Sequence, residues 1–270
     1  KTITVNEDGT FSDTLKVETG IYNFFDGSES TNVFLKNGFD INMTLDTKEF
    51  DETITYTGTG AEHSNFLAEK SLKEEELLDM DELSTITEMD ELDKAMENIK
   101  TELSEFYASK TGIDSSLTNN AVKDIEPMLK FYRSYLADAI TLKKDLPKGA
   151  PSPTFEDYEN VDGTTTSFED LKGKYTYIDV WATWCGPCKA EIPSLKALEK
   201  EYHDKNIQFL SLSIDELFAP NGWQTPFVRE YKINGIPRFI LIDPDGNIVT
   251  PDAPRPSSEK LKELFDSLNI

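Results

Sequence analysis

The two cysteines of this chain, Cys185 and Cys188, lie three positions apart and constrain its fold more than any other feature. A disulfide framework needs cysteine pairs spread along the chain, and a zinc site needs two further ligands at comparable spacing. The histidines, His63 and His203, are far apart and belong to no ligand pattern, so we expect packing or surface roles for both. The sequence therefore predicts neither a disulfide framework nor a metal site.

The cysteine pair sits between a predicted strand and a predicted helix. Residues 175–181 and 207–214 have the apolar composition of strands, and a helical run over residues 187–202 joins them. This order predicts a βαβ unit. A hairpin at residues 238–249 and a helix over residues 258–268 complete an α/β pattern for this half of the chain.

The segment Cys185-Gly186-Pro187-Cys188 opens the predicted helix, where unpaired backbone N–H groups and the helix dipole favour negative charge. A thiolate is stabilised there, and a cysteine pKa can fall from about 8.5 toward 7 or below. The spacing also lets the second sulfur attack the first after a mixed disulfide has formed. The alternatives, half of a metal site or a structural pair, are disfavoured because a second cysteine pair is absent.

The first part of the chain is predicted to be an antiparallel sheet or a small sandwich. Apolar residues alternate with polar ones over residues 39–45, and we expect strands throughout residues 1–57. Asp8-Gly9 and Asn37-Gly38 supply the positive backbone dihedral angles that tight hairpins require.

Residues 62–146 change to helical periodicity, most clearly from Met89 to Phe106. Gly112 is expected to end that helix, and Pro127 is expected to start a new helix rather than lie inside one. The proline-rich segment 146–154 then disfavours helix and sheet alike. We therefore predict an α+β domain of sheet and helices over residues 1–146 and an α/β domain over residues 147–270.

The net charge of −24 argues against nucleic acid or an anionic membrane as a partner. No apolar run reaches the roughly 20 residues of a membrane span, and no hydrophobic leader follows Lys1. Residues 62–105 hold 15 acidic and 4 basic side chains. A solvated helix face explains them most simply, and a surface for a basic partner is the alternative.

Three motifs show a family resemblance over residues 149–270. These are WATWCGPCKAEIP at 181–193, APSPTFEDYENVDGTTTSFEDLKGKY at 150–175 and GIPRFILIDPDGNIV at 235–249. Together they resemble the thioredoxin superfamily, and in particular the TlpA/ResA-like thiol–disulfide oxidoreductases of bacterial envelopes. The resemblance implies a thioredoxin fold for this half, with the α+β domain as an addition.

By this resemblance, Cys185 is the exposed attacking cysteine and Cys188 the buried resolving one. Ile236-Pro237 is expected to be a cis peptide that faces the cysteines and lays the substrate strand against them. Trp184 is expected to shield the site and Pro193 to kink the helix, with ordinary packing as the alternative for both. The implied substrate-binding residues are Trp184, Gly186, Pro187 and Ile236, beside the catalytic residues Cys185, Cys188, Asp179 and Pro237.

Asp179 lies in a strand between Ile178 and Val180, where an isolated carboxylate is costly unless it has a task. The matching residue of thioredoxin relays a proton to the resolving cysteine, so the resemblance implies that role here, near Cys188. A satisfied structural carboxylate is the alternative. Glu191 fits the TlpA-like pattern, and its role stays open because an exposed helical glutamate is the usual case.

The sequence departs from the family after Ile214, where Asp215 and Glu216 lead directly into Leu217. A strand crossover normally needs a dozen or more residues, so a helix of the family is expected to be missing here, either deleted from the protein or left out of the printed sequence.

The predicted function is an exported thiol–disulfide oxidoreductase that reduces protein disulfides without a cofactor. Disulfide-containing proteins are the expected substrates, and a membrane thiol reductant is the expected electron donor. The resemblance places the protein in the bacterial envelope or periplasm, and a lipid anchor and a homodimer stay open. The alternatives are a disulfide oxidase or isomerase, or a redox-silent scaffold that acts through its acidic N-terminal half.

Overall fold

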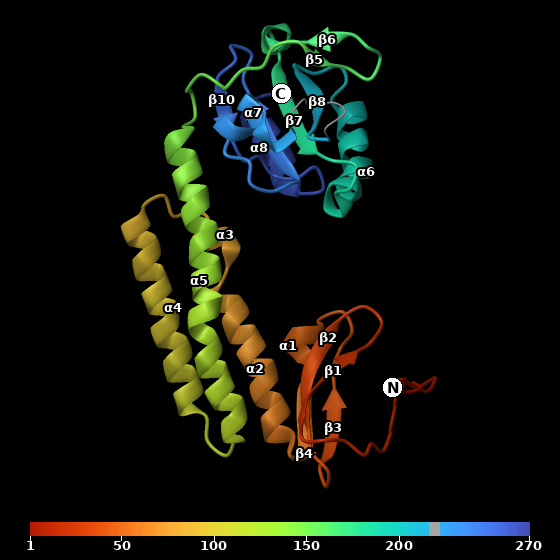
Figure 1. The fold of residues 1–270 in the computed structure, drawn as a ribbon. Helices are drawn as coiled ribbons and strands as arrows, with labels where there is room; N and C mark the ends of the chain where they lie inside the picture. The colour runs from red at the N-terminus through yellow and green to blue at the C-terminus, as the bar shows by residue number, and fades with distance from the viewer. Residues whose placement is uncertain (216–221) are drawn as a thin grey trace. The chain divides into compact units, whose positions relative to one another are not determined.

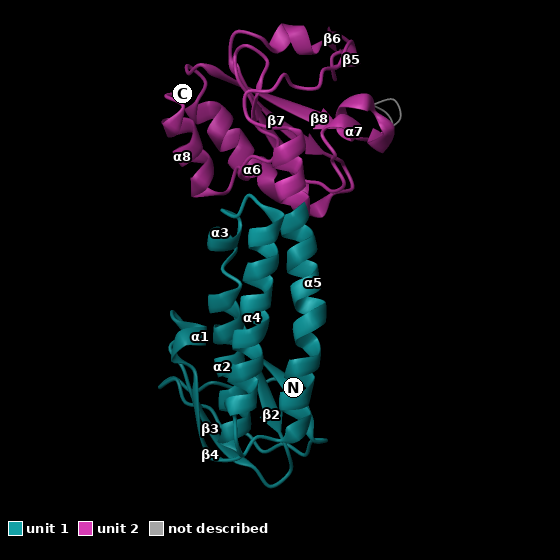
Figure 2. Ribbon diagram, turned by 90° about the vertical axis from the view of Figure 1, so that its left-hand side faces the viewer, with its two compact units in different colours: residues 1–137 teal, residues 138–270 magenta. Residues whose placement is uncertain are grey.

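The computed structural model describes residues 1–215 and 222–270. The chain divides into two compact units, residues 1–137 and 138–270, which Figure 2 shows in different colours. The division falls inside a helix, a little before the proline-rich segment at which the sequence places the domain boundary. Each unit is described separately below.

The first unit starts with two separate two-stranded antiparallel sheets. Its strands are β1 (Gly20–Phe25), β2 (Ser30–Leu35), β3 (Asp40–Thr44) and β4 (Thr55–Thr59), with the short helix α1 (Phe50–Thr53) before β4. The alternation over residues 39–45 is confirmed, because the odd positions are half-buried and the even ones are exposed.

Two expectations for this region are wrong. Residues 1–19 contain no strand, and their exposed Val5 and Leu15 show how little apolar surface they bury. Gly9 and Gly38 do have positive φ angles of 82° and 96°, but neither turn closes a hairpin. The Asn37-Gly38 turn joins β2 to β3, which do not pair with each other. A turn residue fixes local backbone geometry only, and the pairing partner depends on contacts made elsewhere.

The helices of this unit follow the apolar periodicity of the sequence (Figure 1). They are α2 (Ala61–Leu77), α3 (Met80–Leu83), α4 (Met89–Ser109) and α5 (Ser115–Asp145). Helix α2 packs on β2 and β4, and its Ser64 hydroxyl accepts a hydrogen bond from the Phe34 N–H at 3.1 Å. The apolar stripe of α4 is core, since Leu92, Met96, Ile99 and Leu103 are buried.

Pro127 lies inside α5, so the expectation that it starts a new helix is wrong. An interior proline removes one backbone hydrogen bond and costs roughly 3 kcal/mol. Pro127 itself is exposed, whereas Ile125 and Leu129 on either side of it are buried. The ion pair between Arg133 and Asp93, at 2.7 Å, also ties the following turns to α4. Burial of the apolar side chains of α5 thus outweighs the cost of placing Pro127 inside the helix.

The second unit is built on one four-stranded sheet, and the predicted βαβ unit and hairpin are confirmed. The strands are β7 (Tyr175–Trp181), β8 (Ile207–Ser213), β9 (Arg238–Ile242) and β10 (Ile248–Thr250), in the order β10-β9-β7-β8. Strands β7 and β8 are parallel and joined by α6 (Gly186–Glu201), whereas β9 runs antiparallel to both β7 and β10. Helix α8 (Glu259–Ser267) closes the chain.

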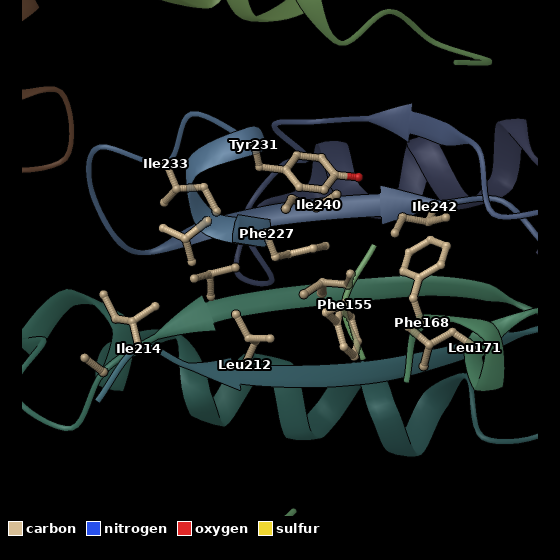
Figure 3. Close-up of a cluster of buried hydrophobic side chains, with 14 of the residues drawn as sticks. Phe155, Phe168, Leu171, Leu212, Ile214, Phe227, Tyr231, Ile233, Ile240 and Ile242 are labelled. Carbon is tan, nitrogen blue, oxygen red and sulfur yellow. The ribbon is translucent and has the colours of Figure 1, made fainter. Parts of the chain in front are cut away.

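Alternate side chains of the central strand β7 belong to two separate hydrophobic clusters, one on each face of the sheet. Ile178 and Val180 belong to one buried cluster. Figure 3 labels other members of that cluster, among them Phe155 and Phe227. Tyr177 belongs to the cluster on the other face, with side chains of α6 and α8. Burial on both faces explains why β7 reads as a nearly continuous apolar run.

The proline-rich segment is not a free linker. Its Gly149 N–H donates to Ile248 O at 2.8 Å, and its Ser152 N–H donates to Gly246 O at 3.0 Å. The segment therefore runs along the β9–β10 hairpin of its own unit. A small hairpin follows it, made of β5 (Tyr158–Glu159) and β6 (Thr165–Thr166).

The connection from β8 to β9 carries two short helices, the 3₁₀ helix η2 (Gly222–Gln224) and α7 (Pro226–Glu230). The expected departure at Glu216 and Leu217 lies outside the described residues. Within residues 1–215 and 222–270, no helix has both the length and the apolar character needed to cross a membrane.

Candidate functional site

Cys185 and Cys188 are joined by a disulfide bond at the start of α6, with their Cα atoms 5.3 Å apart. Cys185 is the N-cap residue of the helix, and its sulfur accepts a hydrogen bond from the Cys188 N–H at 3.1 Å. Pro187 occupies the first turn, where its missing N–H costs nothing. The first turn of α6 thus directs a backbone donor at the sulfur of Cys185.

Both cysteines are buried in this oxidised form, with 4% of Cys185 and 2% of Cys188 exposed. The expectation that Cys185 is exposed is therefore wrong for the disulfide state, because Cys185 is bonded to Cys188 and both belong to the buried hydrophobic cluster around Ile178 and Val180. Around it, Trp184 is 62% exposed, and Gly186 and Pro187 are exposed as well. A surface of three exposed residues thus surrounds a sulfur that is nearly covered.

The loop before β9 packs against the hydrophobic cluster to which both cysteines belong. The Ile236–Pro237 peptide bond is cis, and both residues are half-buried. Ile236 packs against the same hydrophobic cluster that contains Cys185 and Cys188. Segments about fifty residues apart in the sequence therefore contribute to the same hydrophobic cluster.

Asp179 is a buried carboxyl group in the middle of β7. It lies opposite Ser211 of β8 and Phe239 of β9 and is 6% exposed. Its Oδ1 atom is buried and accepts no hydrogen bond from the described residues. Burial, and secondarily the negative charge of Glu191, raise the pKa of Asp179 to about 7. This carboxyl group can therefore take up or release a proton near neutral pH.

Glu191 is buried too, contrary to the usual case of an exposed helical glutamate. It lies one turn after Cys188 on α6, on the same side of the helix. Its carboxylate accepts hydrogen bonds from the Ser257 N–H at 3.0 Å and the Ser257 hydroxyl at 2.9 Å, with Arg255 at 3.9 Å. The negative charge of Glu191, on the same helix as Cys188, helps to raise the pKa of Asp179 in β7.

Ser257 is a site residue that the sequence does not reveal. It ends the segment 251–257, which is fixed where Ala253 N–H donates to Phe239 O at 2.8 Å and the Tyr177 hydroxyl donates to Pro254 O at 2.7 Å. A serine 66 positions after Glu191 gives no periodic or motif signal. The sequence indicates only that this segment, PDAPRPS, is not helical, because it contains three prolines.

We expect Ser257→Ala to lower the free energy of unfolding of the second unit by about 1–2 kcal/mol, since one hydrogen bond to a buried carboxylate is lost. Chemical denaturation followed by tryptophan fluorescence measures this unit selectively, because Trp181, Trp184 and Trp223 all lie in it. Ser267→Ala, at the exposed end of α8, is the matched control and should change little. Equal stabilities of the two variants would contradict the role given to Ser257.

The arrangement supports dithiol–disulfide chemistry. It combines a cysteine at a helix N-cap, a second cysteine within bonding distance, and a buried carboxyl group that titrates near neutrality. Among the residues that the structure describes, no group of three or more histidine, cysteine or acidic side chains could hold a metal ion.

Comparison with known proteins points to the same chemistry. The Redoxin family model matches residues 147–221. The thiol-disulfide oxidoreductase ResA of Bacillus cereus is 27% identical over 152 residues, which are 51% of this chain and 85% of that protein. The thioredoxin-like protein YneN of Bacillus subtilis is 40% identical over 74 residues, 27% of this chain and 41% of that protein.

Among solved structures, the thioredoxin domain of a thiol-disulfide oxidoreductase from Bacteroides vulgatus is 25% identical, with a TM-score of 0.40. That match covers 46% of this chain and 98% of the other. The similarity to known proteins thus extends over about half of the chain.

Proposed function

Because the chain belongs to the thioredoxin superfamily, as a TlpA/ResA-like thiol–disulfide oxidoreductase, we propose that it reduces disulfide bonds of protein substrates through Cys185 and Cys188. The observation that carries this proposal is the position of Cys185 at the N-cap of α6, where the Cys188 N–H donates to its sulfur. The same donor stabilises a thiolate once the disulfide is reduced.

The reaction balances as two exchanges. The Cys185 thiolate attacks one sulfur of the substrate disulfide, the other substrate sulfur leaves as a thiolate, and a mixed disulfide forms. The Cys188 thiolate then attacks the Cys185 sulfur and releases the second substrate thiolate. The enzyme ends as the disulfide seen in the structure, and the substrate has gained two electrons.

The substrate is proposed to lie across the exposed surface beside Cys185. Trp184, Gly186 and Pro187 are exposed there, and we assign Ile236 and Pro237 to the same binding surface because Ile236 packs against the cluster that contains both cysteines. Trp184, Gly186 and Pro187 flank Cys185 in the sequence and are exposed, so a protein disulfide that approaches Cys185 meets them. Their exposure therefore favours a binding role over ordinary packing, at least for Trp184.

Asp179 is proposed to accept the proton of the Cys188 thiol before the second exchange. A base with a pKa near the working pH is the most effective in such a transfer, and the pKa of Asp179 is raised to about 7. Its link to Glu191, one turn from Cys188, supports a position beneath the resolving cysteine.

The cellular setting is proposed from the relatives. We propose that the protein works in the bacterial envelope, that a membrane thiol reductant regenerates its dithiol, and that a lipid anchor is compatible with this setting. We propose that the first unit selects substrates or mediates a homodimer, acting beside the redox unit over residues 147–270.

Turnover of insulin disulfides in the presence of dithiothreitol tests the proposal. We expect the protein to accelerate precipitation of the insulin B chain well above the rate with dithiothreitol alone. Oxidative refolding of a reduced, denatured ribonuclease is the matched assay for an oxidase or isomerase. Activity confined to the second assay would favour the oxidase or isomerase, and no exchange in either would favour the redox-silent scaffold.

A further inference from the structure

The second residue after β8, Asp215, accepts three hydrogen bonds through its carboxylate from two segments of the second unit. Its Oδ2 atom accepts a hydrogen bond from the Thr183 N–H at 2.9 Å and another from the Ser213 hydroxyl at 2.8 Å. Its Oδ1 atom accepts from the Thr183 hydroxyl at 3.2 Å. One carboxylate thus binds both the backbone and the side chain of a residue 32 positions away.

Thr183 lies in the loop between β7 and α6, immediately before Trp184 and Cys185. Within this loop, Cys185 N–H donates to Ala182 O at 3.1 Å, which closes a tight turn but holds the loop to nothing outside itself. The Ile214 N–H donates to Trp181 O at 2.9 Å and carries the β7–β8 pairing to the edge of the loop. Asp215, the next residue, is hydrogen-bonded to Thr183 and so connects the end of β8 to the loop itself.

The carboxylate is well suited to hold a backbone N–H. Partial burial alone would raise the pKa of Asp215, but the hydrogen bonds from Thr183 and Ser213 outweigh it and keep the pKa below its ordinary value. Asp215 is therefore ionised at neutral pH, and hydrogen bonds to an ionised acceptor are roughly twice as strong as neutral ones. Because the main contact is to a backbone N–H, it fixes the path of the chain and not only one side chain.

We propose that Asp215 is a positioning residue for disulfide exchange, and that by clamping Thr183 it holds Trp184 and Cys185 in the conformation that receives a protein disulfide. This inference rests on the proposed function. A role confined to ending β8 is the simpler alternative, and the bond from Asp215 N–H to the Ser213 hydroxyl at 3.1 Å belongs to that role. The hydrogen bonds to Thr183 are not explained by that role, because Thr183 lies in the active-site loop and not in β8.

Amide hydrogen exchange at Thr183, read by nuclear magnetic resonance on the full chain, tests the clamp directly. We expect Asp215→Ala to speed exchange of this amide about tenfold or more, because its hydrogen-bond acceptor is lost. Asp215→Asn keeps an oxygen that can accept the same bond and should restore most of the protection. Asp204→Ala, which removes an exposed carboxylate from the loop before β8, is the control and should leave the exchange unchanged.

The kinetic test compares a protein disulfide with a small one. We expect Asp215→Ala to lower kcat/KM for insulin about tenfold and to change kcat/KM for a small aromatic disulfide less than threefold, since only the protein needs the Trp184 surface in place. Asp215→Asn should recover insulin reduction to within about threefold of the wild-type chain. Ser213→Ala, which removes one support of the carboxylate and leaves Thr183 intact, should fall between the two.

Each outcome decides the proposal. Unchanged Thr183 exchange in Asp215→Ala shows that the clamp does not exist, and faster exchange with unchanged insulin kinetics shows that it is structural only. If Asp215→Ala does not fold, Asp215→Asn and Ser213→Ala are compared with the wild-type chain instead. Equal kcat/KM values for insulin in all three proteins would overturn the proposal. If the wild-type chain reduces no disulfide, the proposed function fails, and the positioning role fails with it even where the exchange data show the clamp.

Discussion

Replacing Cys185 with serine should reduce insulin turnover to the uncatalysed background, whereas replacing Cys188 with serine should trap covalent complexes with substrates. Serine keeps the shape of the side chain but supplies no thiolate, so Cys185→Ser cannot begin the first exchange. Cys188→Ser can begin it and cannot finish it, because no second sulfur attacks the mixed disulfide. Non-reducing electrophoresis and mass spectrometry of the trapped species measure the difference.

The two variants control for each other, since they alter neighbouring positions of the same helix turn. Complexes trapped by Cys185→Ser and not by Cys188→Ser would reverse the roles proposed for the two cysteines. Complexes from neither variant, with a wild-type chain that turns over insulin, would show that exchange does not pass through a mixed disulfide with this pair.

Asp179→Asn should stabilise the second unit strongly above neutral pH. A pKa raised from 3.8 to about 7 corresponds to about 4 kcal/mol of unfavourable ionisation in the folded state. The stability from the protonated carboxyl group is fully present below pH 3.8 and is lost as the pH rises toward 7. The gain from asparagine should therefore grow between pH 4 and 7 and stay constant above, up to about 4 kcal/mol.

Urea unfolding of the oxidised protein, followed by tryptophan fluorescence, measures this gain without interference from titrating thiols. Asp204→Asn, whose carboxylate is exposed, should show no such pH dependence. A gain from Asp179→Asn that is equal at pH 5 and pH 8 would show that Asp179 does not titrate in this range.

The same substitution should affect the two exchange steps unequally. If Asp179 accepts the Cys188 proton, Asp179→Asn slows release of the reduced substrate more than the first attack by Cys185. Rapid-mixing kinetics with a fluorescent disulfide peptide resolve the two steps. Unchanged rates of both steps near neutral pH would remove the relay role from Asp179 and leave it a structural carboxyl group.

Much of the second unit can be predicted from the sequence because its signals are local. The strand–helix–strand order around Cys185 appears directly in the apolar pattern, and the hairpin before β10 is marked by Asp245-Gly246. The burial of Asp179 also follows from its apolar neighbours in β7.

Contacts between distant segments could not be predicted in this way. From the sequence alone, Glu191 is an ordinary helical glutamate. Its binding partner, Ser257, lies 66 residues later in the chain, so the contact cannot be predicted from local sequence. Asp215 likewise acquires its role only when β8 pairs with β7 and places it beside Thr183. The family resemblance implies an exposed Cys185, whereas in the disulfide state Cys185 is buried within a hydrophobic cluster.

The first unit shows the same limit on a larger scale. Pro127 carries a strong local preference against a helix interior, and the burial of Ile125 and Leu129 overrides it. The turns at Gly9 and Gly38 have the predicted positive φ angles, but a turn does not specify which strands pair.

The reduction potential of the Cys185–Cys188 pair decides whether this protein can act as a disulfide reductase. Equilibration with glutathione or thioredoxin redox buffers, followed by thiol alkylation and mass spectrometry, gives this value for the full chain. We expect a potential near that of thioredoxin, about −270 mV, at which the dithiol form can reduce protein disulfides. A potential near about −120 mV, as in the strong disulfide oxidants, would contradict it.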